Sequence, residues 1–288
     1  MCRLFAQLTT VPGSAESWLV TADRSLLAQS NVTPEEAQSD GWGIGWYTDG
    51  GRTRVEKGVG GAYMPGERDR YVRAAAEANG TFIMGHLRHA SNPLHLPPER
   101  LLALENSQPF DTHTVLFGHN GAIPFPTETR PLLGLYESKV KGVNDSEVLF
   151  YLLLRHTEET GNPLLAYIRT TEDLVRVWQA MKRPPIPPFS GLNILFSRGP
   201  EELWAFCQWT GDHGTGLIDS TRRYYEMTYL AQPHRVIVGS EPFDGERGVW
   251  KSLPSGSYLH ASRNSHHVEV QSGRIPLPTA LEMPVPPA

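Results

Sequence analysis

The sequence predicts an α+β fold in which strands form mixed or antiparallel sheets and helices lie outside them. Two observations support this prediction. Strand-like segments occur before residue 119 and after residue 191, and the two clearest helical segments lie between them. Strands and helices also do not alternate along the chain, and no repeat of about 20 to 50 residues is present, so neither a doubly wound sheet nor a repeat architecture is expected.

The first part of the chain contains one helical pattern among several strand patterns. Residues 2–8 (CRLFAQL) predict a short strand at the start of the chain, and the spacing of apolar residues over 14–29 predicts a helix after it. Short apolar or alternating runs at 42–47, 81–87 and 113–118, each bounded by Gly, Asn or Asp, predict three more strands that end in polar loops.

The clearest helix is expected at 145–159, where Asn144 and Glu147 resemble a capping box ahead of a run of apolar residues. A second helix is expected at 164–182, and four prolines between 184 and 188 end it. The strands expected after these helices are 192–197, 202–209, 225–231, 235–239 and 257–261.

The 288 residues are enough for one large domain or two small ones, with a sizeable core. The predicted elements indicate one domain over 2–275. The tail, 276–288, is rich in proline and is expected to be disordered. A tail of this length cannot bury a core, so no second catalytic domain is expected after the first.

Composition excludes several classes of partner. With 39% hydrophobic and 20% charged residues the chain resembles an ordinary globular protein, and no apolar run approaches the length that spans a bilayer. The first residues lack the pattern of a secretory signal, which favours a cytoplasmic location. The net charge of −5, without a cluster of Lys and Arg, argues against nucleic acid as a partner.

Cysteine occurs only as Cys2 and Cys207, and a disulfide between them is not expected in a cytoplasmic chain. Cys207, within LWAFCQW, is interpreted as a buried strand thiol. If Met1 is removed, Cys2 carries both a thiol and a free α-amino group. Since a free α-amine ordinarily has a pKa of about 7.7–8.0 and a thiol one of about 8.5, the amine could take up the thiol proton. The alternative is that Cys2 is only the first core residue of a strand.

Four short segments contain further candidate residues, and each also has an ordinary structural explanation. The first could be a turn that leads into a strand, and Arg88 could be a surface cation. Asn120 and Gly121 could form a type I′ turn, and Asp145 could be an acid favoured by a helix dipole. The segments are DGWGIG (40–45), HLRHAS (86–91), HNGA (119–122) and NDSE (144–147).

Together with the initial MCR and with ENSQPF at 105–110, these segments follow the order of motifs in a known family. The chain resembles the class II glutamine amidotransferases over about residues 2–260. It is most similar to their stand-alone branch, such as the YafJ-type and ergothioneine-pathway γ-glutamyl hydrolases. The resemblance implies the four-layered αββα sandwich of N-terminal-nucleophile hydrolases. It also implies cysteine-dependent hydrolysis of a γ-glutamyl amide bond, in glutamine or in a γ-glutamyl peptide or thiol metabolite, through a γ-glutamyl thioester.

The resemblance also implies roles for individual residues. Cys2 corresponds to the nucleophile, and the Asn120 side chain and the Gly121 N–H correspond to the oxyanion hole. Arg88 corresponds to the residue that binds the substrate α-carboxylate, and Asp145 to the one that binds its α-ammonium. Three neighbouring motif residues are placed with the substrate-binding group on the same basis: His86, Gly41 and Trp42.

The chain departs from the family pattern at two positions. Gln108 stands where the family has histidine in ENTHPF, and His89 stands where many relatives have an aromatic residue or glutamine. These departures concern the leaving-group side, so they affect the expected substrate and not the reaction type.

Metal and nucleotide sites are not expected, and no cofactor is implied. His86, His89 and His95 match no standard zinc spacing, and no nucleotide-binding glycine motif is present. Two alternatives to a stand-alone hydrolase remain: a glutaminase subunit that supplies ammonia to a separate synthase, and a catalytically silent binding module of the same fold. A homo-oligomer and a separate partner subunit are both left open.

Overall fold

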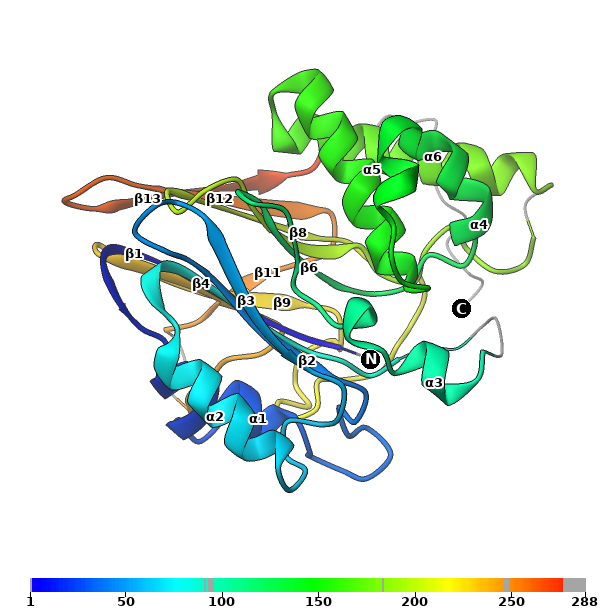
Figure 1. Cartoon of the computed structure of the whole chain (residues 1–288). Helices are drawn as coiled ribbons and strands as arrows, with labels where there is room; N and C mark the ends of the chain where they lie inside the picture. The colour runs from blue at the N-terminus through cyan, green and yellow to red at the C-terminus, as the bar shows by residue number, and fades with distance from the viewer. Residues whose placement is uncertain (1, 91, 93–95, 183, 246–248, 277–288) are drawn as a thin grey trace.

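The computed structural model of the chain describes residues 2–90, 92, 96–182, 184–245 and 249–276. Two stacked β-sheets lie between a layer of helices that contains α5 and α6 and a layer that contains α1 and α2 (Figure 1). Every strand pairing among the described residues is antiparallel. The predicted α+β class and the αββα sandwich are confirmed.

The seven-stranded sheet has the order β11-β9-β10-β1-β4-β2-β3, so the first strand of the chain lies at its centre. β1 pairs with β10 on one side and with β4 on the other, where Leu4 lies opposite His86. The strands are β1 (Arg3–Ser14), β2 (Trp42–Tyr47), β3 (Thr53–Gly58), β4 (Asn79–Leu87), β9 (Met227–Gln232), β10 (Arg235–Gly239) and β11 (Lys251–Leu253).

The six-stranded sheet has the order β13-β12-β8-β7-β6-β5. β6 pairs with β7 along its whole length, whereas β5 reaches only Leu116 and Phe117 of β6. The strands are β5 (Phe110–Asp111), β6 (Leu116–Asn120), β7 (Asn193–Ser197), β8 (Glu202–Cys207), β12 (Ser257–Arg263) and β13 (Val268–Arg274).

Each helix layer packs its apolar side chains on one sheet. Phe150 of α5 lies in the same buried cluster as Phe117 of β6, and Tyr71 of α2 contacts Trp42 of β2 edge to face with ring centroids 5.3 Å apart. The helices are η1 (Ser17–Thr21), α1 (Leu26–Gln29), α2 (Glu67–Glu77), α3 (Pro98–Leu101), η2 (Leu104–Asn106), α4 (Pro126–Thr129), η3 (Arg130–Lys139), α5 (Asp145–Thr160) and α6 (Pro163–Ala180).

The alternation of side chains along β1 determines which way Cys2 points. Leu4 belongs to the buried cluster between the two sheets, whereas Phe5 belongs to the cluster under α1 and α2. Because strand side chains alternate between the two faces, Cys2 lies on the inter-sheet side with Leu4, and Arg3 lies on the outer side with Phe5. The thiol is therefore directed between the sheets.

Several predicted elements need correction. The helix expected over 14–29 is absent, because β1 continues to Ser14 and is followed by two short helices, η1 and α1. The strand expected at 113–118 is shifted to Leu116–Asn120. Strands β3 and β13 and helix α2 were not expected, since β13 is largely exposed and α2 buries only Tyr71, Ala74 and Ala75.

The two long helices were placed correctly, but the predicted capping box is only half present. The Asn144 side chain accepts a hydrogen bond from the Ser146 N–H, as an N-cap should. Glu147 instead accepts from the N–H groups of Lys141 and Gly142, at 2.9 and 2.7 Å, and so binds the loop that precedes α5.

Residues 277–288, most of the predicted tail, lie outside the described residues, so the domain boundary at 275 stays a prediction. Cys2 and Cys207 are both free thiols, and Cys207 is fully buried on β8 as expected. None of the described helices has the length and apolarity that crossing a membrane requires.

Candidate active site

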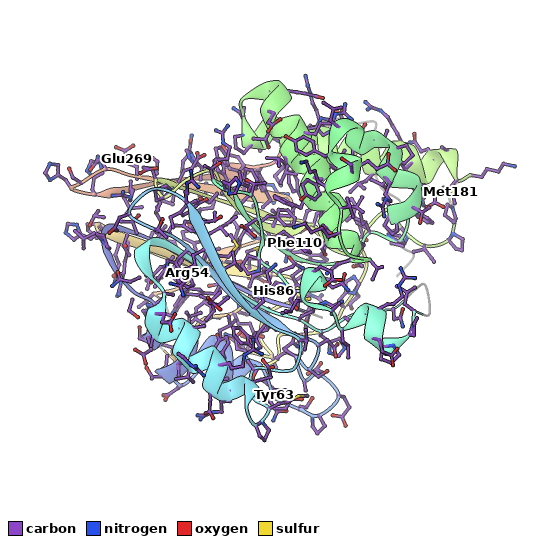
Figure 2. All side chains as sticks on the ribbon, in the orientation of Figure 1. Arg54, Tyr63, His86, Phe110, Met181 and Glu269 are labelled. Carbon is purple, nitrogen blue, oxygen red and sulfur yellow. The ribbon has the colours of Figure 1, made fainter. Side chains whose placement is uncertain are left out.

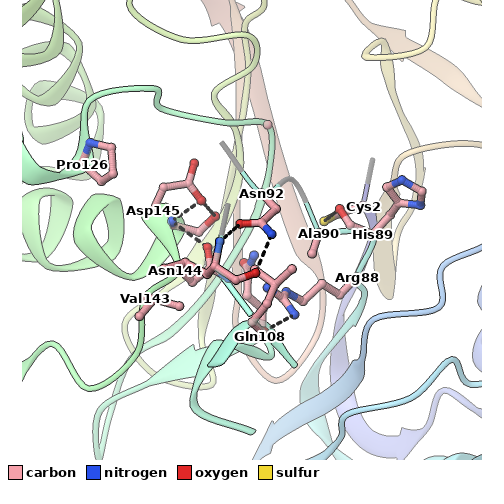
Figure 3. A pocket seen from close by; sticks show the side chains of 14 residues that line it. Cys2, Arg88, His89, Ala90, Asn92, Gln108, Pro126, Val143, Asn144 and Asp145 are labelled. Atoms are coloured by element: carbon pink, nitrogen blue, oxygen red, sulfur yellow. Dashed lines mark hydrogen bonds between the residues drawn. The ribbon is translucent and has the colours of Figure 1, made fainter. Parts of the chain in front are cut away.

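A pocket opens where β1 begins and β6 ends, beside the first turn of α5. Its walls include Cys2, Arg88, Gln108, Gly121, Asn144 and Asp145, and Figure 3 shows labelled side chains around it. Residues from five places in the sequence thus come together here. Cys2, Arg88, Gly121 and Asp145 are four of the residues that the sequence indicates.

Cys2 is half-buried, and its Sγ lies 3.7 Å from the carbonyl oxygen of His89, to which the thiol donates. Burial raises the pKa of the Cys2 thiol above its ordinary value, although the positive charge of Arg88 acts in the opposite direction. The thiol is therefore protonated at neutral pH, and it needs a base before it can act as a nucleophile.

Arg88 follows directly after β4, and its side chain is 3% exposed. Its Nη1 donates to the carbonyl oxygens of Asp40 and Leu101 at 3.1 and 3.0 Å. The Arg88 backbone N–H donates to Gly41, and the carboxylate of Asp40 accepts from the Ala90 N–H at 2.7 Å. The DGWG segment therefore holds the guanidinium in a fixed position at the pocket wall.

Asp145 is the first residue of α5, where a negative charge is favoured by the helix dipole. One carboxylate oxygen accepts from the Ile123 N–H at 2.7 Å and the other from the Ser146 N–H at 2.9 Å. Burial raises the pKa of Asp145, while the neighbouring His119 lowers it. An ionised carboxylate has about four lone-pair sites, so Asp145 can still accept from a bound cation.

Asn120 ends β6, and its side chain is completely buried. Neither of its amide atoms has a hydrogen-bond partner among the described residues. Leaving a buried polar group unpaired costs about 1–3 kcal/mol, so such a group is typical of a functional site. Side chains alternate along β6, where Leu116 belongs to the inter-sheet cluster, so Asn120 lies on the same side as Cys2.

Gly121 makes the turn after β6 with a φ of 153°, and a Cβ there would lie 2.0 Å from the Gly191 carbonyl oxygen. No other residue fits without moving the backbone. Gly121 lines the pocket, whereas Asn120, the residue before it, is buried behind the wall.

The family model "Glutamine amidotransferases class-II" matches residues 1–267 of the chain. The chain belongs to the class-II glutamine amidotransferases. It is accordingly an enzyme of the amidohydrolase type, which acts on carbon–nitrogen bonds.

Two relatives are 26% identical to this amidotransferase. One is the gamma-glutamyl-hercynylcysteine sulfoxide hydrolase of Mycolicibacterium smegmatis, with 93% of this chain and 98% of the relative covered. The other is the probable glutamine amidotransferase DUG3 of Saccharomyces cerevisiae, with 76% and 68% covered.

Two solved structures share the fold. A glutamine aminotransferase class-II domain protein from Silicibacter pomeroyi superimposes with a TM-score of 0.64 at 20% identity, covering 95% of this chain and 99% of that one. The glutamine phosphoribosylpyrophosphate amidotransferase of B. subtilis superimposes with a TM-score of 0.57 at 16% identity, covering 96% of this chain and 50% of that one.

The three other residues assigned to substrate binding do not line the pocket of this amidotransferase. His86 is fully buried in the interior (Figure 2), and Trp42 is 1% exposed and donates to Glu67 at 2.7 Å. Gly41 accepts from the Arg88 N–H. These residues adjoin the site because β2 and β4 run beneath it, but adjacent strand residues face opposite sides. Among these three, Gly41 contacts a residue of the pocket wall, Arg88, whereas His86 contacts the His119 carbonyl oxygen at 3.2 Å.

One buried ion pair was not expected from the sequence. Arg3 lies 3.3 Å from Glu241, with both side chains almost inaccessible, and its guanidinium stacks over the Tyr224 ring at 4.3 Å. Glu241 also accepts from three consecutive backbone N–H groups, at Leu217, Ile218 and Asp219. Arg3 therefore links β1, through Glu241, to the loop before β9, and no motif marks Glu241.

No metal site is present among the described residues, where no group of three or more His, Cys, Asp or Glu side chains is close enough to hold an ion. The Nδ1 of His89 donates a hydrogen bond to the carbonyl oxygen of Ala37, at 2.9 Å. His95, the last histidine of the run considered above, lies outside the described residues.

Proposed function

We propose that the chain hydrolyses a γ-glutamyl amide bond, with Cys2 as an N-terminal nucleophile and a γ-glutamyl thioester as the intermediate. The observation that carries this proposal is the arrangement of one pocket. It combines a thiol, a buried guanidinium and a half-buried carboxylate, and the unpartnered amide belongs to Asn120, the residue before Gly121 of the pocket wall. Each of these groups matches a different part of a γ-glutamyl substrate.

The two charged side chains would orient the substrate. Arg88 would bind the α-carboxylate, for which a planar guanidinium offers a bidentate contact, and Asp145 would accept hydrogen bonds from the α-ammonium. Because these two groups of a glutamyl residue share one carbon, binding both of them fixes the direction of the side chain. Its distal amide would then lie next to Cys2.

Removal of Met1 would supply the missing base. A free α-amine ordinarily has a pKa of about 7.7–8.0, and that of Cys2 would accept the proton of a thiol that burial keeps neutral. The sulfur would then attack the amide carbon, and the Asn120 amide and the Gly121 N–H would stabilise the oxyanion. As the C–N bond breaks, the ammonium would return the proton to the leaving amine. Water would hydrolyse the thioester and release glutamate.

The names of the two relatives indicate a broad class of substrate and not a single compound. One relative is named a gamma-glutamyl-hercynylcysteine sulfoxide hydrolase and the other a probable glutamine amidotransferase. The same charged pair would hold the γ-glutamyl part in either case. The proposal therefore includes glutamine, γ-glutamyl peptides and γ-glutamyl thiol metabolites as candidate substrates, and it places the enzyme in the cytoplasm.

The test is glutamate release by the purified chain without partners. We expect steady-state turnover of at least one compound from a panel of glutamine, γ-glutamyl peptides and γ-glutamyl thiol compounds, with Cys2→Ala as the negative control. If turnover begins only when another subunit is added, the chain is instead a glutaminase subunit. If the folded chain turns over nothing under either condition, it is a binding module.

Arg88→Lys and Asp145→Asn are expected to raise KM about tenfold or more, and to change kcat much less, since charge-assisted hydrogen bonds are lost to groups that the reaction leaves unchanged. Steady-state kinetics on the best substrate of the panel measures this. Arg73→Lys and Asp49→Asn, at exposed positions, are the matched controls. A fall in kcat at constant KM would mean that these roles are misassigned.

A further inference from the structure

His119 is a buried polar residue that lies next to the pocket without lining it. It precedes Asn120 on β6 and is fully buried. Its side chain lies on the α5 side of the sheet, with Nδ1 2.8 Å from the Ser146 hydroxyl and Nε2 3.0 Å from the Gly191 carbonyl oxygen. The ring therefore joins the first turn of α5 to the segment that precedes β7.

The hydrogen bonds of the ring determine its tautomer. A carbonyl oxygen can only accept, so Nε2 carries a hydrogen and donates to Gly191. Burial lowers the pKa of His119, although the charge of Asp145 acts in the opposite direction, and the ring is neutral. Nδ1 is then an acceptor, and the Ser146 hydroxyl donates to it.

Each end of the ring contacts a different part of the proposed site. Ser146 donates its N–H to Asp145 at 2.9 Å, so one end supports the carboxylate that would bind the α-ammonium. Gly191 packs directly on Gly121, and Ser190, the residue before it, accepts from the Ala122 N–H at 3.0 Å. The other end therefore supports the turn that would bind the oxyanion.

Gln108 holds the backbone of His119 in register. Its side-chain oxygen accepts from the His119 N–H at 2.6 Å, and its nitrogen donates to the His119 carbonyl at 3.2 Å. β5 ends its pairing at Leu116 and Phe117, so this amide replaces the missing strand partner. The oxygen and nitrogen of a primary amide lie side by side, so one side chain can accept from the N–H and donate to the C=O of the same strand residue, whereas an imidazole carries its two nitrogens on different sides of its ring.

From these contacts we propose that His119 is a positioning residue that supports both halves of the site, in the tautomer with hydrogen on Nε2. Through Ser146 it positions Asp145, and through Gly191 it positions the turn at Gly121. The kinetic consequences rest on the proposed function, whereas the tautomer does not.

Two substitutions separate the two contacts. The amide of asparagine reaches the place of Nδ1, and the amide of glutamine reaches the place of Nε2. His119→Gln loses the contact with Ser146 and is expected to raise KM about tenfold, whereas His119→Asn loses the contact with Gly191 and is expected to lower kcat about tenfold.

Ser146 provides the check by rescue. Ser146→Ala should raise KM like His119→Gln, and Ser146→Thr, which restores the hydroxyl, should return KM to the wild-type value. His267→Gln, at an exposed position, is the matched control. If His119→Asn and His119→Gln alter kcat and KM to the same extent, the ring has a purely structural role and the proposal is overturned.

Nitrogen-15 NMR of the histidine side chains tests the inference without any substrate. We expect hydrogen on Nε2 of His119 and a changed Nδ1 resonance in Ser146→Ala. Hydrogen on Nδ1, or a charged ring at neutral pH, would overturn the proposal. If the wild-type chain turned over no γ-glutamyl compound, the proposed function would fail, and the NMR result would still decide the tautomer.

Discussion

Replacement of Cys2 with alanine is expected to lower glutamate release by about a thousandfold or more, since it removes the atom that would form the thioester. The loss should appear in kcat for every substrate of the panel, and the melting temperature should remain close to that of the wild type. Cys207→Ala is the matched control, because that thiol is buried on β8, away from the pocket. Its turnover should stay near the wild-type value.

The same expectation extends to the amino group. A glycine placed before Cys2, so that the chain begins Gly-Cys, keeps the thiol but moves the free amine one residue away, and it should remove activity to a similar extent. Intact-mass measurement establishes which residue begins each preparation. A fully active enzyme that retains Met1 would rule out the amine as the base, whatever the role of the thiol.

Asn120→Ala is expected to lower kcat by about 10²–10³-fold with little change in KM, because an oxyanion donor acts mainly in the transition state. Both amide atoms of Asn120 are buried without a partner among the described residues, so their removal should not lower the melting temperature. Asn264→Ala, in the exposed turn between β12 and β13, is the control. An unchanged kcat with a raised KM would assign Asn120 to substrate binding instead.

Much of the fold could be predicted because strong local patterns coincide with buried elements. α5 and α6 carry long apolar faces, and each is preceded by an asparagine that acts as its N-cap, Asn144 and Asn162. α2 could not be predicted in the same way, since only three of its residues are buried between charged ones. The pattern over 14–29 was misleading, because most of its apolar residues lie in two separate short helices, η1 and α1, that face the same core.

The candidate site, like the fold, could be predicted only in part. The order of motifs indicated Cys2, Arg88, Gly121 and Asp145, which do line one pocket. Their neighbours could not be sorted by position in a motif, since Trp42 lies in the cluster under α2 while His86 faces the other sheet. Contacts between distant segments, such as Arg3 with Glu241, leave no local pattern in the sequence because tertiary pairing alone creates them.

The central position of β1 has a consequence for biosynthesis. β10, which encloses β1 on one side, lies more than 200 residues later in the chain, so at about 5–20 residues per second the ribosome completes it roughly 10–50 s after the first residues. During that interval the first residues cannot yet be enclosed between both neighbouring strands. If Met1 is removed, the peptidase can therefore act on an accessible nascent chain. In that case the α-amine of Cys2 would be freed before β10 closes over β1.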